Sequence, residues 1–137
     1  MPDAERFMER LIPWWLKIDP ATVREFFHPD GRIRWLPNIR RPITPAQLQR
    51  VFERITQALP DIRIECRHWA ARGDIVFAEV RIGATLAGQP LEWGAIDRFR
   101  LRGERAIEQV AYLDVEPLRA AGIETGSVLA GLDLGQA

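Results

Sequence analysis

The spacing of apolar residues changes at Pro60, and this change limits the folds open to a chain of 137 residues. Before Pro60, apolar residues recur with a period near 3.6, which is typical of amphipathic helices. After Pro60 they alternate with polar residues, and a period of 2 is typical of strands with one buried face. Four long strands are therefore predicted, at about 61–70, 75–86, 91–101 and 107–115.

The first part of the chain predicts three helices. Residues 3–18 have helical spacing that is interrupted by Pro13, which we expect to kink the last turn. A short second helix is predicted after Asp19-Pro20, since aspartate caps helices and proline is tolerated in the first turn. Thr44 and Gln47 fit a capping box that begins the third helix.

The order of these elements predicts an α+β fold. A first strand is expected at 31–36, and the helices precede the run of long strands. We expect a cone-shaped, curved antiparallel sheet, with three helices from the N-terminal half packed on its concave face. One domain is predicted over residues 1–121. The tail, 122–137, is rich in Gly, Ala and Leu, and we expect it either to be flexible or to cover the pocket or a partner subunit.

Charge and composition argue against several classes of function. Nineteen basic residues balance nineteen acidic residues, so the chain lacks the positive charge that binding to nucleic acid or an anionic membrane usually requires. No stretch approaches the roughly 18 apolar residues of a membrane span, and the N-terminus lacks the pattern of a secretory leader, so a cytoplasmic protein is predicted. Cys66 is the only cysteine, and neither a metal nor another cofactor is expected.

Asp97 is the main candidate functional residue. Side chains alternate between faces along the strand 91–101, which places Asp97 beside Trp93 and Phe99, opposite a face rich in arginine. An ionised carboxylate is costly to bury unless a partner pairs with it. One interpretation is a structural carboxylate satisfied by Trp93, Gln109 or backbone donors. The other is a functional acid, whose raised pKa lets it donate a hydrogen bond to a ligand or transfer a proton.

The same alternation predicts a ligand pocket beneath the helices. Pockets for small molecules are mostly apolar and hold few polar groups. The tryptophans are either plain core or walls that favour flat apolar ligands. The residues expected to line the pocket are Trp14, Trp15, Ile33, Trp35, Val80, Ile82, Trp93, Asp97, Phe99, Gln109 and Ala111.

Two segments, FFHPDGRIRW at 26–35 and AIDRFRLRGERAIEQVAYLDV at 95–115, resemble a known group of proteins. From Phe7 to about Leu118 the chain is similar to the nuclear transport factor 2-like superfamily, which includes SnoaL-like polyketide cyclases, ketosteroid isomerases and limonene epoxide hydrolases. The resemblance implies a cone-shaped α+β fold and a homodimer. This fold hosts enzymes, binding domains and scaffolds, so it does not by itself imply one activity.

Only some of the catalytic positions of these enzymes fall on chemically suitable residues of this chain. Asp97 falls on the position of the oxyanion-hole acid of the isomerases, where the cyclases have a histidine. The base of the isomerases falls on or near Trp35. The arginine and aspartate of the epoxide hydrolases fall on Val80 and Ile82, and the last-strand aspartate of hydrolases and cyclases falls on Ala111. One acidic position is therefore retained without the partners that each mechanism uses.

The sequence thus predicts a SnoaL-like protein that binds an apolar, oxygen-bearing small molecule, with Asp97 as acid or hydrogen-bond donor. If it is an enzyme, an isomerase, a cyclase or an epoxide hydrolase is the expected class. The alternative is a non-catalytic dimerising domain that binds a ligand or serves as a scaffold, because the outer face of the sheet carries charges of both signs that could pair across a two-fold interface. These two functions differ in what they require of the pocket: either it is open, or Trp35 and Trp93 fill it.

Overall fold

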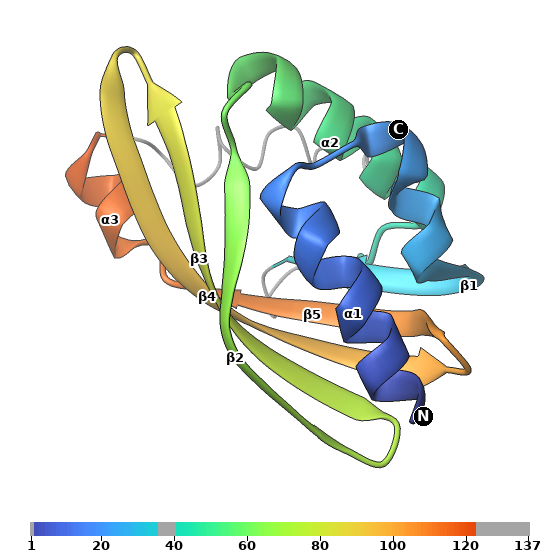
Figure 1. Ribbon diagram of the computed structural model, residues 1–137. Coiled ribbons are helices and arrows are strands. Elements are labelled where there is room, and N and C mark those ends of the chain that lie inside the picture. Colours follow the sequence, from blue (N-terminus) through green and yellow to red (C-terminus); the bar gives the residue numbers. More distant parts are fainter. Residues whose placement is uncertain (1, 36–40, 123–137) are drawn as a thin grey trace.

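The computed structural model describes residues 2–35 and 41–122, and Figure 1 shows their arrangement. Of the predicted tail, all but Gly122 lies outside the described residues. Within this part of the chain, no helix is long and apolar enough to cross a membrane. The elements in chain order are α1 (Asp3–Leu16), the 3₁₀ helix η1 (Pro20–Phe26), β1 (Phe27–Arg34), α2 (Pro45–Ala58), β2 (Arg63–Arg72), β3 (Ile75–Leu86), β4 (Gln89–Arg102), β5 (Arg105–Leu113) and α3 (Glu116–Ala120).

The strands form one sheet in the order β1-β5-β4-β3-β2. Each pair from β2 to β5 is antiparallel, as the four predicted strands require. At the edge, β1 lies parallel to β5, so the sheet is mixed and the expectation of a wholly antiparallel sheet is wrong for this strand. No hairpin joins β1 to β5, and two strands without a hairpin between them are free to run in the same direction.

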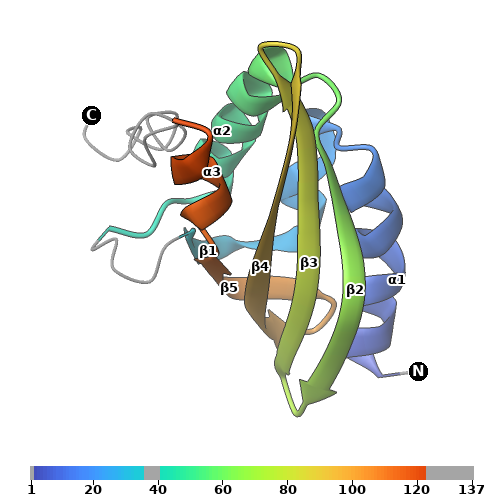
Figure 2. The same cartoon turned by 90° about the vertical axis from the view of Figure 1, so that its left-hand side faces the viewer.

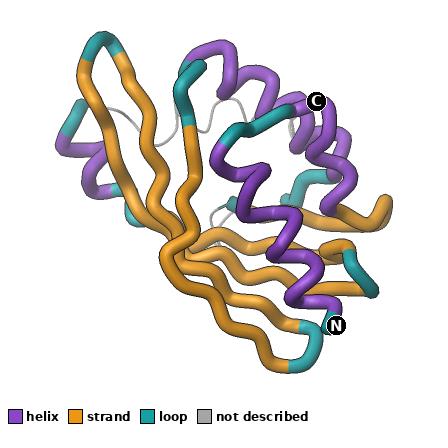
Figure 3. The backbone as a smooth tube through the Cα atoms, viewed as in Figure 1, coloured by secondary structure: helices purple, strands orange, loops and turns teal. Residues whose placement is uncertain are grey.

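The sheet is strongly curved, and α1 and α2 lie on its concave side (Figures 1 and 2). The tube in Figure 3 shows the same arrangement, with the helices beside the bent strands. Phe7 of α1 and Phe99 of β4 are buried and meet edge to face, with their ring centroids 5.1 Å apart. Such a pair adds about 1 kcal/mol to the apolar burial that holds α1 against the sheet. The α+β architecture, which was predicted from helical spacing of apolar residues followed by strand-like alternation, is therefore confirmed.

Helix α1 runs through Pro13 to Leu16. Proline removes one hydrogen bond from the helix, but burial of one apolar face offsets that loss. The buried residues of this face are Ala4, Phe7, Met8, Leu11 and Trp15.

Helix α2 begins at the predicted capping box. Gln47 N donates to Thr44 Oγ1 over 3.2 Å, and Thr44 N donates to Gln47 Oε1 over 2.9 Å. Two backbone N–H groups of the first turn are thereby satisfied, which stabilises the helix by about 1 kcal/mol. The cap fixes where α2 starts, and hence how far Phe52, Ile55 and Leu59 reach along the concave face.

Two local differences from the predicted strands affect the site. β1 begins at Phe27 and ends at Arg34, so Trp35 follows the strand rather than lying within it. The register of β2 against β3 shifts between Cys66 and His68, and His68 is exposed although alternation alone places it inward. A bulge inserts one residue and reverses the side of every residue that follows. His68 is consequently not a residue of the concave face.

Candidate functional site

A cavity of about 90 Å³ lies on the concave side of the sheet, beneath α2. All but two of its lining residues, Asp97 and Gln109, are apolar or aromatic, which is typical of sites for small molecules. The fifteen lining residues are Trp15, Trp35, Phe52, Ile55, Leu59, Ile62, Ile64, Ile82, Trp93, Ala95, Asp97, Gln109, Ala111, Leu113 and Leu118.

The structure brings seven of the eleven predicted site residues together around this cavity. They are Trp15, Trp35, Ile82, Trp93, Asp97, Gln109 and Ala111.

The other four predicted residues lie outside the lining. Ile33, Val80 and Phe99 are buried in the core. Trp14 is half-buried, and its Nε1–H donates to Thr22 Oγ1 over 2.8 Å. That hydrogen bond ties the end of α1 to η1 and leaves Trp15, on a neighbouring face of the helix, toward the cavity.

The sequence prediction missed eight lining residues. Phe52, Ile55 and Leu59 come from α2, whose apolar spacing already indicated that they point inward. Leu118 comes from α3, a helix of five residues that is too short to give a periodic signal. The remaining missed residues are Ile62, Ile64, Ala95 and Leu113.

Asp97 lies in β4, with small residues directly opposite it on both neighbouring strands. Its partners in register are Ala78 of β3 and Ala111 of β5. Neither methyl group can donate a hydrogen bond, and neither fills the space beside the carboxyl group. A partner must therefore come from a diagonal position, within reach of long side chains across a sheet.

Gln109 of β5 supplies that partner. Its Nε2 donates to Asp97 Oδ1 over 3.3 Å. Both residues are buried, with 6% of Asp97 and 8% of Gln109 exposed. Burial raises the pKa of the Asp97 carboxyl group from its ordinary 3.8 to about 7, and the hydrogen bond from Gln109 opposes this rise. Near neutral pH, both the protonated and the ionised forms of Asp97 are populated.

Cys66 of β2 is a titratable neighbour of Asp97. Burial raises the pKa of its thiol above 9.0, and the negative charges of Asp97 and Glu79 raise it further. The thiol therefore stays neutral near pH 7, and it is not activated as a nucleophile.

In the part of the chain that the structure describes, the lining offers a single ionisable side chain, that of Asp97. Within the described residues, no arginine, lysine or histidine forms an ion pair with it. No group of three His, Cys, Asp or Glu in these ranges could hold a metal ion. The arrangement can thus donate or accept one proton, or one hydrogen bond, within an apolar enclosure.

The chain belongs to the SnoaL-like domain family, whose model matches residues 4–109. No curated protein matches it in sequence. Among solved structures, AclR from Streptomyces galilaeus, a proposed hydroxylase, is 20% identical and has a TM-score of 0.75, with 90% of this chain and 100% of that chain covered. IdmH from Streptomyces antibioticus, a proposed polyketide cyclase, is 19% identical, with a TM-score of 0.75 and the same coverage.

A third similar structure is a protein with a ketosteroid isomerase-like fold from Catenulispora acidiphila, in complex with trimethylamine. It is 19% identical, with a TM-score of 0.74, and the match covers 86% of this chain and 93% of that chain. At these identities, the comparisons establish a shared fold.

Proposed function

We propose that this protein binds a compact, apolar small molecule that carries an oxygen atom, with Asp97 hydrogen-bonded to that oxygen. The observation that carries the proposal is that Asp97, 6% exposed, is the one ionisable group among the described residues of a lining that is apolar except for Asp97 and Gln109. Keeping a carboxyl group in such surroundings destabilises the fold, and a ligand contact is a physical reason for its presence there. The family's small-molecule chemistry supports the same conclusion.

Asp97 can act on such a ligand in two ways. In its protonated form it donates to a carbonyl or epoxide oxygen and draws electron density from the adjacent carbon. In its ionised form it accepts a proton or a hydrogen bond. If the ligand is converted, acid-assisted isomerisation, cyclisation or epoxide opening is the reaction class, with Gln109 orienting the carboxyl group. The likeness to IdmH, a proposed cyclase, supports this class.

The volume of the cavity limits the ligand. An apolar cavity of about 150 Å³ holds benzene, whereas this cavity measures about 90 Å³. Steroids and multi-ring polyketides exceed this volume, so the cavity could hold only a part of such a molecule unless wall residues such as Trp35 move. The trimethylamine in the Catenulispora structure is a compact molecule, which supports a small ligand for this fold. Compact ketones, alcohols and epoxides are therefore the first compounds to test.

A thermal-shift screen with such compounds tests the proposal. We expect the ligand to stabilise the wild type and to stabilise Asp97→Leu much less. The substitution removes the polar group that holds the ligand and puts an apolar side chain of similar size in its place. Asp30→Asn is the matched control, since Asp30 is exposed on β1. Equal stabilisation of the wild type and Asp97→Leu would remove Asp97 from ligand binding.

We also propose that two copies associate through the outer face of the sheet. Phe77, Ile96 and Tyr112 lie on this face of adjacent strands and are 47%, 40% and 47% exposed. An exposed apolar patch rimmed by charges is typical of protein interfaces.

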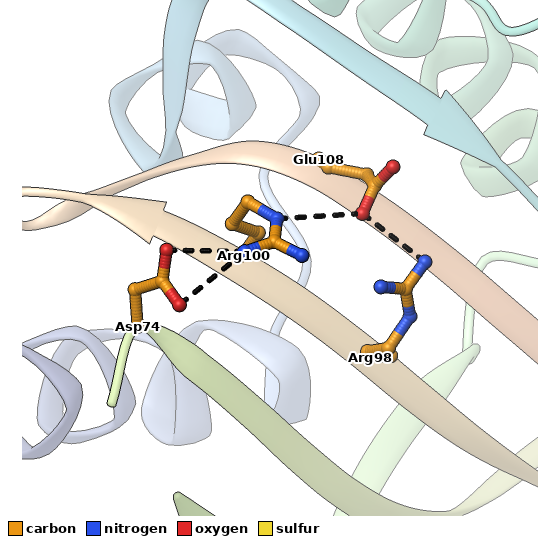
Figure 4. A network of polar contacts seen from close by, with 4 residues as sticks. All are labelled: Asp74, Arg98, Arg100 and Glu108. Atoms are coloured by element: carbon orange, nitrogen blue, oxygen red, sulfur yellow. Dashed lines mark hydrogen bonds and ion pairs between the residues drawn. The ribbon is translucent and has the colours of Figure 1, made fainter. Parts of the chain in front are cut away.

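Figure 4 shows four charged residues of the sheet, Asp74, Arg98, Arg100 and Glu108, and Arg98 lies opposite Phe77 of the patch in the pairing of β3 with β4. Arg98 lies 3.1 Å from Glu108, and Arg100 lies 3.2 Å from Asp74. Charges of both signs on one face can pair with a second copy related by a two-fold axis. Sedimentation at several concentrations is the test. We expect a dimer that Ile96→Glu dissociates, and a wild type that is monomeric throughout would contradict the proposal.

A further inference from the structure

We propose that the cavity selects a small alkylammonium ion, held by the Asp97 carboxylate among the tryptophan rings. The inference rests on the proposal that this cavity binds a compact small molecule, and it assigns a charged ligand to the site in place of the neutral, oxygen-bearing one. Three independent properties of the cavity lead to it: its charge, its aromatic walls and its size.

The charge of the cavity is the first property. Among the described residues, Asp97 is the one ionisable group of the lining, and none of their cationic side chains is paired with it. A neutral ligand leaves the ionised carboxylate buried and uncompensated, which is costly. A cationic ligand supplies the missing charge, and two opposite charges attract strongly where water is excluded. Among the described residues, no cationic side chain balances the ionised form of Asp97, and a bound cation would do so.

The aromatic walls are the second property. Trp15 from α1, Trp35 after β1 and Trp93 from β4 all line the cavity, together with Phe52 from α2. Indole faces attract ammonium groups more strongly than the other aromatic side chains, and they solvate methyl groups well. These residues reach the cavity from four separate segments, so aromatic surface surrounds the space on more than one side. Such surroundings suit an ion whose charge is spread over methyl groups.

The polar groups of the cavity point to the same ligand. Gln109 uses an amide N–H to hold Asp97 Oδ1. Once ionised, the carboxyl group can only accept hydrogen bonds, so it matches a cation or a donor rather than another acceptor. A carbonyl ligand, in contrast, requires the protonated carboxyl group.

The size of the cavity is the third property. At about 90 Å³ it is smaller than the roughly 150 Å³ that accommodate benzene. Tetramethylammonium and tert-butanol are compact and nearly equal in shape, and each is about as bulky as benzene, so the size of the cavity does not favour one over the other. The first carries a positive charge, and the second is neutral and carries an oxygen. The pair therefore separates the charged ligand class from the neutral one.

The two ligand classes have opposite pH dependences. Tetramethylammonium does not titrate, so its affinity should follow the ionised fraction of Asp97. We expect the affinity to rise about tenfold per pH unit below the pKa, which lies at about 7, and to level off above it. The titratable group that interacts electrostatically with Asp97 is Cys66, which stays neutral in this range, and the other described lining residues carry no ionisable group. A carbonyl ligand should instead bind more tightly below the pKa.

The experiment is a calorimetric titration of the full chain with tetramethylammonium chloride and with tert-butanol, at about pH 6 and about pH 8. Sodium chloride is the control for ionic strength. We expect tetramethylammonium to bind more tightly at the higher pH, and Asp97→Asn to weaken it by about tenfold or more while tert-butanol is little affected. Asp30→Asn should leave both affinities unchanged.

A second variant keeps the test decisive if Asp97→Asn folds poorly. Trp35→Leu should weaken the cation about threefold or more, and the neutral alcohol less, because leucine lacks a π face. Binding of tert-butanol without tetramethylammonium would overturn the ammonium inference and leave the proposed function standing. Equal binding of the cation by wild type and Asp97→Asn would also overturn it. Binding of neither compound to the folded protein would overturn both proposals.

Discussion

Gln109 Nε2 donates to Asp97 Oδ1 across the boundary between β5 and β4, over 3.3 Å. This diagonal contact joins the two polar side chains of the cavity wall, and it holds one carboxyl oxygen at a fixed position. Within the described ranges, no further side chain is seen to donate to the other oxygen. The carboxyl group is therefore held in one orientation, but no cation neutralises it. We expect this to make the free energy of unfolding depend on pH.

Replacing Asp97 by asparagine should stabilise the protein at alkaline pH. Because the pKa is raised from 3.8 to about 7, the folded chain keeps a proton that the unfolded chain has lost between these values. The free energy of unfolding of the wild type should therefore fall with rising pH over this window, by up to about 4 kcal/mol, and be level above it. Asp97→Asn removes this loss.

Urea unfolding from about pH 4 to about pH 8 measures the effect. The two proteins should be similar at the acidic end, and the variant should be more stable at the alkaline end. Asp30→Asn, at an exposed site, should follow the wild type. A variant that is less stable than the wild type at alkaline pH would show that Asp97 is a structural, paired carboxylate.

Replacing Gln109 by leucine should raise the pKa of Asp97 further. The amide hydrogen bond favours the ionised form, so its loss leaves only the effect of burial. Titration of the Asp97 carboxyl carbon by NMR should give a midpoint above that of the wild type. Gln49→Leu, on α2 away from the cavity lining, is the matched control. A midpoint that moves down would mean that Gln109 does not stabilise the carboxylate.

Removing the cap of α2 should weaken the fold. Thr44→Ala loses the side-chain acceptor of the Gln47 N–H, and we expect the free energy of unfolding to fall by about 1 kcal/mol. Thr56→Ala is the comparison, because Thr56 Oγ1 bonds only to carbonyl groups within the helix, Phe52 O and Glu53 O. Denaturant unfolding of both variants measures the difference. Equal losses would indicate that the capping box has no specific effect.

Two glycines should respond differently to alanine. A Cβ at Gly31 would lie 2.9 Å from His28 O and 3.3 Å from Ala106 O, both backbone atoms of the β1–β5 edge. We expect Gly31→Ala to destabilise the protein by about 1–3 kcal/mol, because strands held in register cannot move apart freely. The three atoms nearest to a Cβ at Gly83 all belong to the guanidinium group of Arg63, the far end of a long, flexible side chain.

Gly83→Ala should accordingly change the melting temperature little. The contrast is measured by thermal unfolding of the two variants side by side. If Gly83→Ala proved the more damaging, the packing of Arg63 over β3 would be more rigid than its chemistry suggests.

Strand alternation predicted the burial of Asp97 from the sequence alone, because a period of 2 fixes which side a residue takes. It could not predict whether an inward residue meets a helix or a cavity. Phe99 lies on the same face as Asp97, yet Phe7 and Trp15 cover it, with ring centroids 5.1 and 6.1 Å away. That distinction depends on where α1 docks, which is a tertiary property.

Other parts of the site depended on contacts between distant segments. The helical spacing of α2 turns Phe52 toward the sheet, but its place in the cavity wall follows from how α2 crosses the sheet. The inward alternation assigned to His68 failed because a bulge leaves no clear mark in the pattern. The parallel pairing of β1 could not be predicted from the sequence either, because its partner, β5, lies far away along the chain.

The pairing of β1 with β5 has a consequence for synthesis. Ile33 lies opposite Gln109 in this pairing, so β1 can pair only after β5, the last of the described strands, has been synthesised. Until β5 has left the exit tunnel, β1 cannot join the sheet, and Gln109, which binds Asp97, is absent from the folded part of the chain. Translation of this protein should thus produce its apolar helices well before the surface that covers them, and the chain should depend on protection from aggregation during that interval.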